Sequence, residues 1–247
     1  PITDEAALRF MSEAENVRIT VGFSGTGGGF RKFCAGETDI QNASRAIEPD
    51  EMTACRENNV EYFVFEIAYD GITVVTNPEN DFVSCLSVEQ LKRLWQPDDP
   101  AKTWQDLDPS WPDERIELYG PGPDSGTFDY FTSSIVGQEG LSRTDYFPSE
   151  NDLDLVEGVA VDEEGLGYFG FAYVDEAGDR LKTVAIDSGA GCVLPTAETI
   201  ADGSYAPLSR PLFVYVRASS LSRPEVTAFM RYYLANAKII AADVGYI

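Results

Sequence analysis

The sequence predicts an α/β fold made of two lobes with largely parallel sheets. Strand-like apolar runs alternate with helix-like runs along the 247 residues, a pattern typical of parallel βα units. A hydrophobic content of 43% is enough for one large or two smaller cores. Segments near 76–80 and 204–210 combine proline with polar residues and are suited to connect two domains. We therefore expect a discontinuous first lobe, residues 1–77 plus 207–247, and an inserted second lobe, residues 78–206.

The first part of the chain is predicted to alternate between helix and strand. Residues 4–16 place apolar side chains on one face of a helix. Residues 16–25 alternate between apolar and polar types and run into glycine, which predicts a strand. Residues 28–40 resume a helical pattern. The first glycine-rich turn is therefore expected between a strand and a helix.

The middle of the chain predicts further strands and a helix. Residues 60–77 are expected to form a pair of apolar strands. Ser87, followed three residues later by Gln90, forms a capping box that opens a helix over 87–96. Residues 114–120 predict a strand that leads directly into a second glycine-rich turn.

The composition limits the classes of function. A formal charge of -24 argues against nucleic acid, which requires a basic surface, and against adsorption to anionic lipid. It is typical of a solvated acidic surface, with storage of cations as an alternative. A small anion must be captured by local groups, because the overall field repels it. No apolar run approaches the roughly 18 residues needed to span a membrane.

The cysteine and histidine content excludes several kinds of chemistry. The chain has four cysteines, no Cys-x-x-Cys pair and no histidine, so zinc-binding patterns and Ser-His-Asp catalysis are ruled out. Two disulfides in an oxidising compartment are one explanation, and free buried thiols are the alternative. We expect neither a metal site nor a cofactor.

Two glycine-rich turns each follow a predicted strand and open a predicted helix, GFSGTGGGF at 22–30 and GPGPDSGTF at 120–128. A helix N-terminus presents unpaired N–H groups and a partial positive charge, which suit an anion. The hydroxyl-bearing residues of the two turns are Ser24, Thr26, Ser125 and Thr127. One glycine turn is usually structural. Two turns with the same hydroxyl chemistry, one in each lobe, indicate a shared anion.

Ser44 and Arg45 lie in a segment of small residues between the two turns. A guanidinium in such surroundings could bind an oxyanion through two hydrogen bonds, and an ordinary surface arginine is the alternative. The first turn has neither the Walker pattern GxxxxGK[ST] nor the context of a dinucleotide fingerprint. Nucleotide binding is therefore not indicated.

Four segments carry a resemblance to a known family: VGFSGTGGGFRKFCAGETDIQNASR, YGPGPDSGTFDYF, LGYFGFAY and PLSRPLFVYV. Together they resemble the phosphate-binding proteins of bacterial and archaeal phosphate ABC transporters, over nearly the whole chain. The resemblance implies a periplasmic-binding-protein fold, with two α/β lobes, a hinge of two crossing strands and phosphate buried in the cleft. It also implies that Thr26, Ser125, Gly126 and Thr127 bind phosphate.

The chain departs from this family near the ligand. Many relatives carry an arginine shortly before Ser-Gly-Thr and an aspartate in the first lobe, whereas this chain has no arginine in 120–124 and carries Arg45 in the first lobe. We expect exchanged roles, in which Arg45 supplies the cation and Asp124 accepts the proton that phosphate retains. Sulfate lacks this proton and would be repelled. The alternative is that Asp124 only caps the helix beginning near Ser125.

The family also has a strand and a glycine-serine-threonine turn ahead of the segment that opens this chain, and it continues beyond the segment matching VGYI at 244–247. One wall of the pocket is therefore expected to be missing. We further expect disulfides Cys34–Cys55 and Cys85–Cys192, the first bracing the Arg45 segment and the second tying two segments of the inserted lobe.

These observations predict a binding protein rather than an enzyme, which takes up inorganic phosphate for the permease of an ABC importer. The expected ligands are Ser24, Thr26, Ser44, Arg45, Asp124, Ser125, Gly126 and Thr127. Another tetrahedral oxyanion, such as sulfate, molybdate or arsenate, is an alternative. So is an ester hydrolase with Ser125 as nucleophile, although a suitable base and the G-x-S-x-G pattern are missing. An acidic adhesion module is the third alternative.

The expected setting follows from the same resemblance. We expect a monomer in the periplasm or outside the cell, where disulfides persist. Attachment to a membrane through a preceding N-terminal segment is an open alternative.

Overall fold

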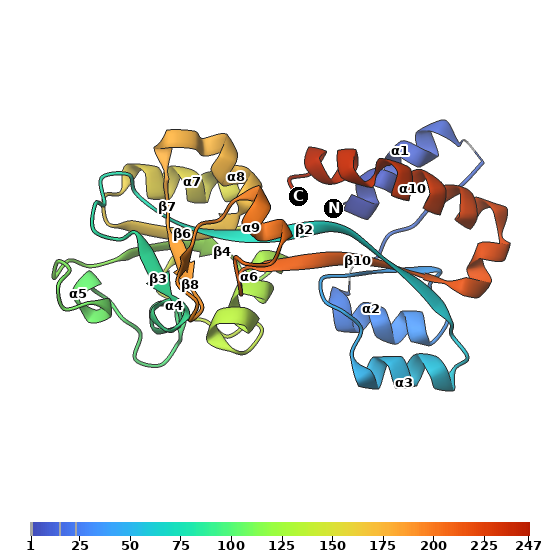
Figure 1. Cartoon of the computed structure of the whole chain (residues 1–247), viewed down its shortest axis with the longest axis horizontal. Coiled ribbons are helices and arrows are strands. Elements are labelled where there is room, and N and C mark those ends of the chain that lie inside the picture. Colours follow the sequence, from blue (N-terminus) through green and yellow to red (C-terminus); the bar gives the residue numbers. More distant parts are fainter. Residues whose placement is uncertain (1, 15, 23) are drawn as a thin grey trace. The chain divides into compact units, whose positions relative to one another are not determined.

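The computed structural model describes residues 2–14, 16–22 and 24–247. The chain forms two compact units, whose elements are labelled in Figure 1. Unit 1 comprises Pro1–Tyr69 and Arg210–Ile247, and unit 2, Asp70–Ser209, is inserted between these segments. The units meet at 69/70 and 209/210, whereas the sequence places the domain boundaries at 77/78 and 206/207.

Unit 1 has helices on both faces of a small sheet. Its helices are α1 (Ile2–Glu13), α2 (Gly25–Cys34), α3 (Pro49–Glu57) and α10 (Pro224–Asp243), with a 3-10 turn at Ala218–Ser222. Its strands are β1 (Ile40–Ala43) and the unit 1 parts of β10 (Ser209–Arg217) and β2 (Tyr62–Thr76), in the order β1-β10-β2. Figure 1 shows α1 and α10 on one side of β2 and β10, and α2 and α3 on the other.

Alternation along β10 explains these layers, because successive strand residues point to opposite faces. Val214 and Val216 are fully buried in the core formed with α1 and α10, which includes Phe229. Tyr215 points to the other face and meets Phe30 of α2 edge-on, with 4.9 Å between ring centroids. This contact holds α2 against the sheet and so positions the first glycine-rich turn.

Unit 2 contains two sheets. The main sheet joins the unit 2 part of β2 to β6 (Gly165–Gly170), β4 (Glu117–Pro121) and β5 (Phe147–Ser149), with β7 (Lys182–Thr183) also paired to β2. The smaller sheet consists of β3 (Cys85–Ser87), β8 (Ala185–Asp187) and β9 (Cys192–Val193). The helices are α4 (Val88–Trp95), α5 (Trp104–Leu107), α6 (Gly126–Phe131), α7 (Asp152–Val161), α8 (Phe171–Ala177) and α9 (Ala197–Ala201). A π-helical segment, Thr132–Val136, continues α6, and a 3-10 turn lies at Gly178–Arg180.

The main sheet of unit 2 also packs helices on both faces. Tyr168 of β6 stacks on Phe131 of α6, with ring centroids 3.7 Å apart, while the adjacent Phe169 lies in the core with Val159 of α7. A Cβ atom at Gly120 would lie 2.9 Å from the Tyr168 ring, closer than real Cβ contacts allow. Glycine at this position therefore lets the end of β4 approach the aromatic cluster of Trp95, Tyr168 and Phe131, the last residue of α6.

Two expectations about the strands are wrong. Where two strands were expected over 60–77, the chain forms one continuous strand, β2, over Tyr62–Thr76. Its first half pairs in unit 1 and its second half pairs with β6 and β7 in unit 2. The sheets are mixed rather than largely parallel. Parallel pairing joins β4 to β5 and β6, and β3 to β8, but β2–β6 and β1–β10 are antiparallel. The chain enters unit 2 along β2 and leaves it at the start of β10. Because the chain leads out of unit 1 along one strand and back along the other, the sheets contain strands of both directions.

The strand expected over 16–25 does not form among the described residues. Val17, Ile19 and Val21 still pack against the core of α1 and α10, and the residues between them are exposed, so the period-2 pattern is present. A strand also needs a hydrogen-bonded neighbour, and no described residue provides one. Residues 15 and 23, within the expected helix 4–16 and strand 16–25, lie outside the described residues.

Other elements match their predictions closely. The expected helix 4–16 corresponds to α1, and the strand 114–120 corresponds to β4. The capping box at α4 is present, because Gln90 N donates to Ser87 Oγ over 3.2 Å and Ser87 N donates to Gln90 Oε1 over 2.9 Å. The helix expected over 28–40 begins earlier, within the glycine turn, and ends at Cys34.

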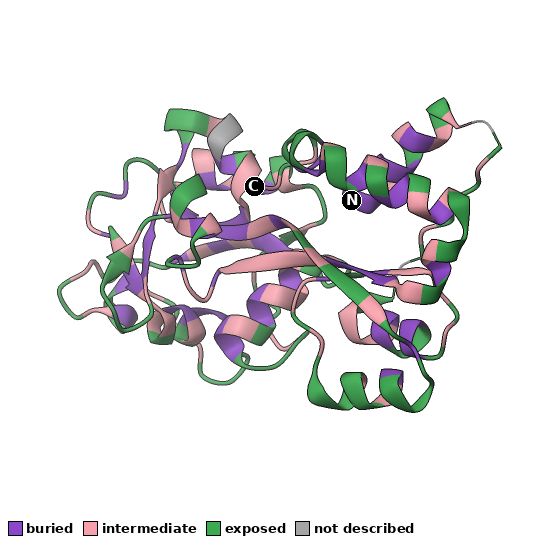
Figure 2. Ribbon diagram, turned by 45° about the vertical axis from the view of Figure 1, so that its right-hand side comes forward, coloured by how far each residue is buried: buried purple, intermediate pink, exposed green. Residues whose placement is uncertain are grey.

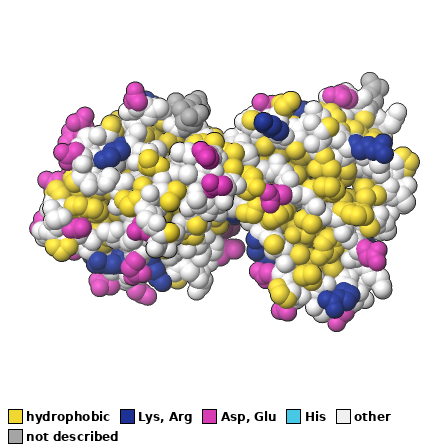
Figure 3. All heavy atoms as spheres, in the orientation of Figure 1, with side chains coloured by type: hydrophobic (Ala, Val, Ile, Leu, Met, Phe, Trp, Pro, Cys, Tyr) yellow, Lys and Arg dark blue, Asp and Glu magenta, His cyan; other side chains and the backbone are white. Residues whose placement is uncertain are grey.

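Unit 1 also carries apolar side chains on its surface. Figure 3 shows hydrophobic atoms gathered on unit 1 between α10 and the α2–α3 layer, where β2 runs. Phe63 and Val64 of β2 are 54% and 49% exposed. The first part of β2 is therefore only half covered by the described residues of its own unit.

Both predicted disulfides are confirmed. Cys34–Cys55 joins the last residue of α2 to α3 in unit 1 and is fully buried. Cys85–Cys192 joins β3 to β9 in unit 2. Each disulfide therefore links segments of a single unit.

Removal of the two disulfides should destabilise the protein to different degrees. The sequence separations are 107 residues for Cys85–Cys192 and 21 for Cys34–Cys55. Loop-closure entropy predicts losses of about 5 and about 3 kcal/mol of unfolding free energy for the respective double alanine variants. The three tryptophans all lie in unit 2, so their fluorescence in a denaturant titration reports that unit, and circular dichroism reports both. An equal loss, or a larger one for Cys34→Ala/Cys55→Ala, would contradict this ordering.

Candidate functional site

The first glycine-rich turn brings Thr26 and Ser44 together in unit 1. Gly25 opens α2 with a φ of 62°, a left-handed conformation that favours glycine. Ser24 occupies the N-cap position but makes no side-chain capping bond. The hydroxyl oxygens of Thr26 and Ser44 are 3.1 Å apart, and Ser44 N donates to Thr26 Oγ1 over 3.2 Å. Two of the predicted ligands therefore share one hydrogen-bonded cluster.

A buried glutamine joins this turn to β1. Gln41 Nε2 donates to the Thr26 carbonyl oxygen over 3.4 Å, and the residue is only 8% exposed. A Cβ atom at Gly29 would lie 2.2 Å from the Gln41 amide. Glycine at position 29 is thus required for Gln41 to reach the first turn of α2.

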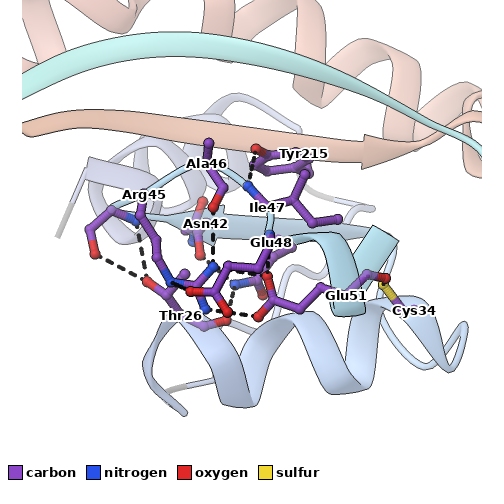
Figure 4. A network of polar contacts seen from close by, with 11 residues as sticks. Thr26, Cys34, Asn42, Arg45, Ala46, Ile47, Glu48, Glu51 and Tyr215 are labelled. Carbon is purple, nitrogen blue, oxygen red and sulfur yellow. Dashed lines mark hydrogen bonds and ion pairs between the residues drawn. The ribbon is translucent and has the colours of Figure 1, made fainter. Parts of the chain in front are cut away.

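Arg45 lies beside the same turn but already holds a carboxylate. Its Nη1 and Nη2 donate to the two oxygens of Glu51, each over 2.8 Å, and its Nε lies 3.3 Å from Glu48 Oε1. Figure 4 shows Arg45 reaching from the loop after β1 toward Glu51 at the start of α3, with Thr26 close by. Nη2 is 3.5 Å from the position that a Cβ atom at Gly27 would occupy. The guanidinium is therefore placed next to the glycine turn by a carboxylate.

The electrostatics of this pair follow from its geometry. Burial alone would raise the pKa of Glu51, but hydrogen bonds from Arg45 and from the Glu48 amide outweigh it and lower that pKa. The Glu51 side chain is 15% exposed, and that of Arg45 is 36% exposed. Glu51 therefore stays ionised, and Arg45 stays charged, throughout the neutral range.

The second glycine-rich turn forms the start of α6 in unit 2. Ser125 is the N-cap residue, and its hydroxyl accepts a hydrogen bond from Thr127 N over 3.2 Å. Ser125 N in turn donates to the Gly122 carbonyl oxygen over 3.1 Å, which closes the turn. Gly126 is exposed, and Ser125 and Thr127 are half-buried. Three predicted ligands therefore surround one helix start.

Asp124 precedes this helix and does not cap it, since Ser125 holds the cap position. Its carboxylate is exposed and accepts no hydrogen bond from the described residues. Its backbone N–H donates to Glu150 Oε1 over 3.4 Å. Glu150 follows β5, which runs parallel to β4, so the two chain ends meet at one edge of the sheet. A second carboxylate therefore adjoins the turn.

Sequence reasoning missed Gln41, Glu51 and Glu150. Glu51 had a usable signal, because Pro49 and an acid two residues later mark the first turn of a helix. Glu150 lacked one, since its proximity to Asp124 depends on the pairing of β4 with β5. In the part of the chain that the structure describes, no cluster of side chains could hold a metal ion.

Comparison with known proteins identifies the family. The family model described as "PBP superfamily domain" matches residues 1–237. Protein SphX of Synechocystis sp. is 50% identical over 250 residues, covering 100% of this chain and 74% of the relative. The phosphate-binding protein PstS of Staphylococcus haemolyticus is 39% identical over 250 residues, covering 100% of this chain and 77% of the relative.

Two solved structures show the same architecture. A possible phosphate binding protein from Planctomyces limnophilus is 43% identical, with a TM-score of 0.94, and the match covers 100% of this chain and 88% of that one. A putative phosphate ABC transporter substrate-binding protein from Clostridium perfringens, solved with bound phosphate, is 26% identical, with a TM-score of 0.66 and coverage of 100% and 94%.

The chain therefore belongs to the PBP superfamily, the class of two-lobe α/β binding proteins that its fold indicates. The particular relatives that it matches along its whole length include phosphate-binding proteins PstS, so the resemblance found in the sequence is confirmed. Among the described residues, no helix is both long and apolar enough to cross a bilayer.

Asp152, the first residue of α7, should make stability depend on pH. Burial and then the neighbouring Glu150 raise the pKa of Asp152 to about 6. An acid with a raised pKa in the folded state stabilises that state at low pH, and the contribution is lost as the pH rises from about 4 to about 6. Asp152→Asn should therefore raise the unfolding free energy at pH 7.5 by on the order of 1–2 kcal/mol, after allowance for partial exposure and the favourable helix dipole. Little change is expected at pH 4.

The control for this prediction is Asp154→Asn. Asp154 is exposed and already accepts hydrogen bonds from Ser149 and Asn151. The Asp154→Asn variant should therefore show no gain in unfolding free energy at pH 7.5. Denaturant titrations of the three proteins at both pH values decide the matter, and a pH-independent effect of Asp152→Asn would contradict the raised pKa.

Proposed function

We propose that the chain binds inorganic phosphate and delivers it to the transmembrane permease of a phosphate ABC importer. The observation that carries this proposal is the cluster of Thr26, Ser44 and Arg45 beside the start of α2. There, two hydroxyls and a guanidinium adjoin the first-turn N–H groups of the helix, which have no intrahelical acceptor. The names of the PstS relatives and the phosphate bound in the Clostridium perfringens structure support it.

Each unit supplies one set of ligands in this proposal. Unit 1 provides hydroxyls and the guanidinium, and unit 2 provides the N-terminus of α6. The full set is Ser24, Thr26, Ser44, Arg45, Asp124, Ser125, Gly126 and Thr127. Hydroxyl and backbone donors add no charge, so they bind an anion without requiring a basic surface, consistent with the formal charge of -24.

Asp124 selects phosphate over sulfate in this proposal. Phosphate near neutral pH carries a proton that a carboxylate can accept, and sulfate carries none. The exposed Asp124 carboxylate, which has no acceptor role toward the described residues and is not needed as a cap, supports this assignment. Other tetrahedral oxyanions, such as sulfate, molybdate and arsenate, are the alternative ligands. Competition titrations of each against phosphate distinguish them.

The proposed role is binding and transport rather than catalysis. The Ser125 hydroxyl is engaged as the helix cap, and no described residue is hydrogen-bonded to it as a base. We further propose a monomer that works in the periplasm or outside the cell. The two disulfides support a location outside the reducing cytoplasm.

Arg45→Ala should weaken phosphate binding by roughly 10-fold to several hundred-fold. The change removes a hydrogen bond to a charged ligand, which typically costs about 1.5–3 kcal/mol, and it leaves the Glu51 carboxylate unpaired beside the anion. Isothermal titration with phosphate measures the loss. Arg56→Ala removes the same charge from an exposed position of α3 and should change the dissociation constant less than about 2-fold. If the two variants weakened phosphate binding equally, Arg45 would act only through the net charge of the protein and not as a ligand.

Asp124→Asn should lower discrimination more than affinity. Asparagine removes the repulsion that excludes sulfate, and its amide can donate to either anion. Competition titrations of phosphate against sulfate for wild type and variant measure the ratio. The control is Glu150→Gln, which neutralises the neighbouring carboxylate but keeps an acceptor for the Asp124 amide. An unchanged phosphate-to-sulfate preference in Asp124→Asn would rule out Asp124 as the proton acceptor. If only Glu150→Gln lost the preference, the proton acceptor would be Glu150.

A further inference from the structure

Arg45 has few hydrogen-bond donors left for a ligand. A guanidinium carries five N–H groups. Glu51 takes one from Nη1 and one from Nη2, the Ala46 carbonyl oxygen takes the second from Nη1 over 3.1 Å, and Nε faces Glu48. Among the described residues, one N–H of Nη2 therefore has no acceptor. Nη2 is also the nitrogen nearest to Gly27 in the glycine turn.

Glu51 is held from several sides. Its Oε2 also accepts a hydrogen bond from Glu48 N over 2.9 Å, within the first turn of α3. One helical turn later, Cys55 is joined to Cys34 at the end of α2. Figure 2 shows that the rest of α3 is mostly exposed, and Cys55 is its only fully buried described residue. The disulfide, the packing of Ala54 against the core around it and the Arg45 contact thus attach α3 beside the site.

Glu51 could either be displaced from Arg45 by phosphate or stay in place while phosphate binds. If phosphate displaced Glu51 from Arg45, a carboxylate that is 15% exposed would lose both guanidinium bonds next to a second anion. Such a loss is costly, because a partly buried charge without its partner is destabilised. If Glu51 stays in place, phosphate receives the remaining Nη2 N–H in a fixed direction.

We propose that Glu51 is a positioning residue for phosphate binding, which holds the Arg45 guanidinium so that one N–H of Nη2 faces the turn at 24–27. This inference rests on the proposed function and adds to it a residue that acts through Arg45. It has an unusual consequence, because a negative charge beside the site strengthens the binding of an anion.

A double-mutant cycle on the full chain tests the proposal. Glu51→Gln keeps the capping acceptor of α3, since glutamine also serves at this helix position, but it weakens the hold on Arg45. It should weaken phosphate binding roughly 10-fold in the wild-type background. In the Arg45→Ala background the same change should cause no loss, or a gain, because only the repulsion of the carboxylate remains to be removed. Isothermal titration with inorganic phosphate measures all four proteins.

Glu48→Gln is the matched control. Glu48 contacts the same guanidinium, but its side chain is 59% exposed and reaches Arg45 through only one contact, of 3.3 Å. Glutamine at this position keeps the acceptor that the Glu48 side chain offers to the first turn of α3. Its substitution should change the dissociation constant less than about 2-fold. Thermal melts without phosphate establish that each variant is folded.

The outcomes separate this inference from the proposed function. Tighter binding by Glu51→Gln in the wild-type background would show that Glu51 competes with phosphate, and an equal loss in both backgrounds would show a purely structural role. Either result overturns the inference, as does an unchanged affinity in Glu51→Gln. Failure of the wild-type protein to bind phosphate would instead overturn the proposed function.

Discussion

The two hydrogen bonds between Arg45 and Glu51 connect the parts of unit 1 on which the candidate site depends. They join the loop after β1 to the first turn of α3, and the Cys34–Cys55 disulfide joins α3 to the end of α2. The contact of Thr26 with Ser44 closes the path back to the start of α2. The helix, the loop and the turn thus form one ring of cross-links. A ligand that binds to this ring meets groups whose positions are already determined, so little ordering entropy is lost on binding.

The two units use different chemistry at their glycine turns. In unit 1 the Arg45 guanidinium beside the turn is paired with carboxylates, so this pair adds direction rather than net positive charge. In unit 2 the turn is flanked by the carboxylates of Asp124 and Glu150. A protein with so acidic a surface cannot rely on attraction at a distance. In the proposed function, discrimination among anions therefore comes from protons and hydrogen-bond directions at contact.

The features predicted from the sequence are those that depend on local chemistry. The glycine turns, the capping box at Ser87, the helices that follow them and the strand before the second turn follow from residue types at short spacing. Features that depend on pairing partners were missed or wrong. The segment 17–22 has the alternation of a strand but no neighbour among the described residues, and β2 runs straight where two strands were expected because it has partners in both units. Arg45 was identified as a cation. Pro49 and Glu51 mark a helix start in the sequence, but the pairing of Glu51 with Arg45 depends on how α3 folds against the loop.

The insertion of unit 2 into unit 1 has a consequence for the order of folding. The sheet of unit 1 pairs β10 with β1 and β2, and all of unit 2 separates β10 from these strands along the chain. Closing so long a loop costs more conformational entropy than closing a short one, and contacts distant in sequence form slowly. Unit 2 consists of one continuous segment, and once it is folded its two ends are held by its own structure. The sheet of unit 1 is then closed across a compact body instead of a flexible chain, so assembly should proceed from the inserted unit outward.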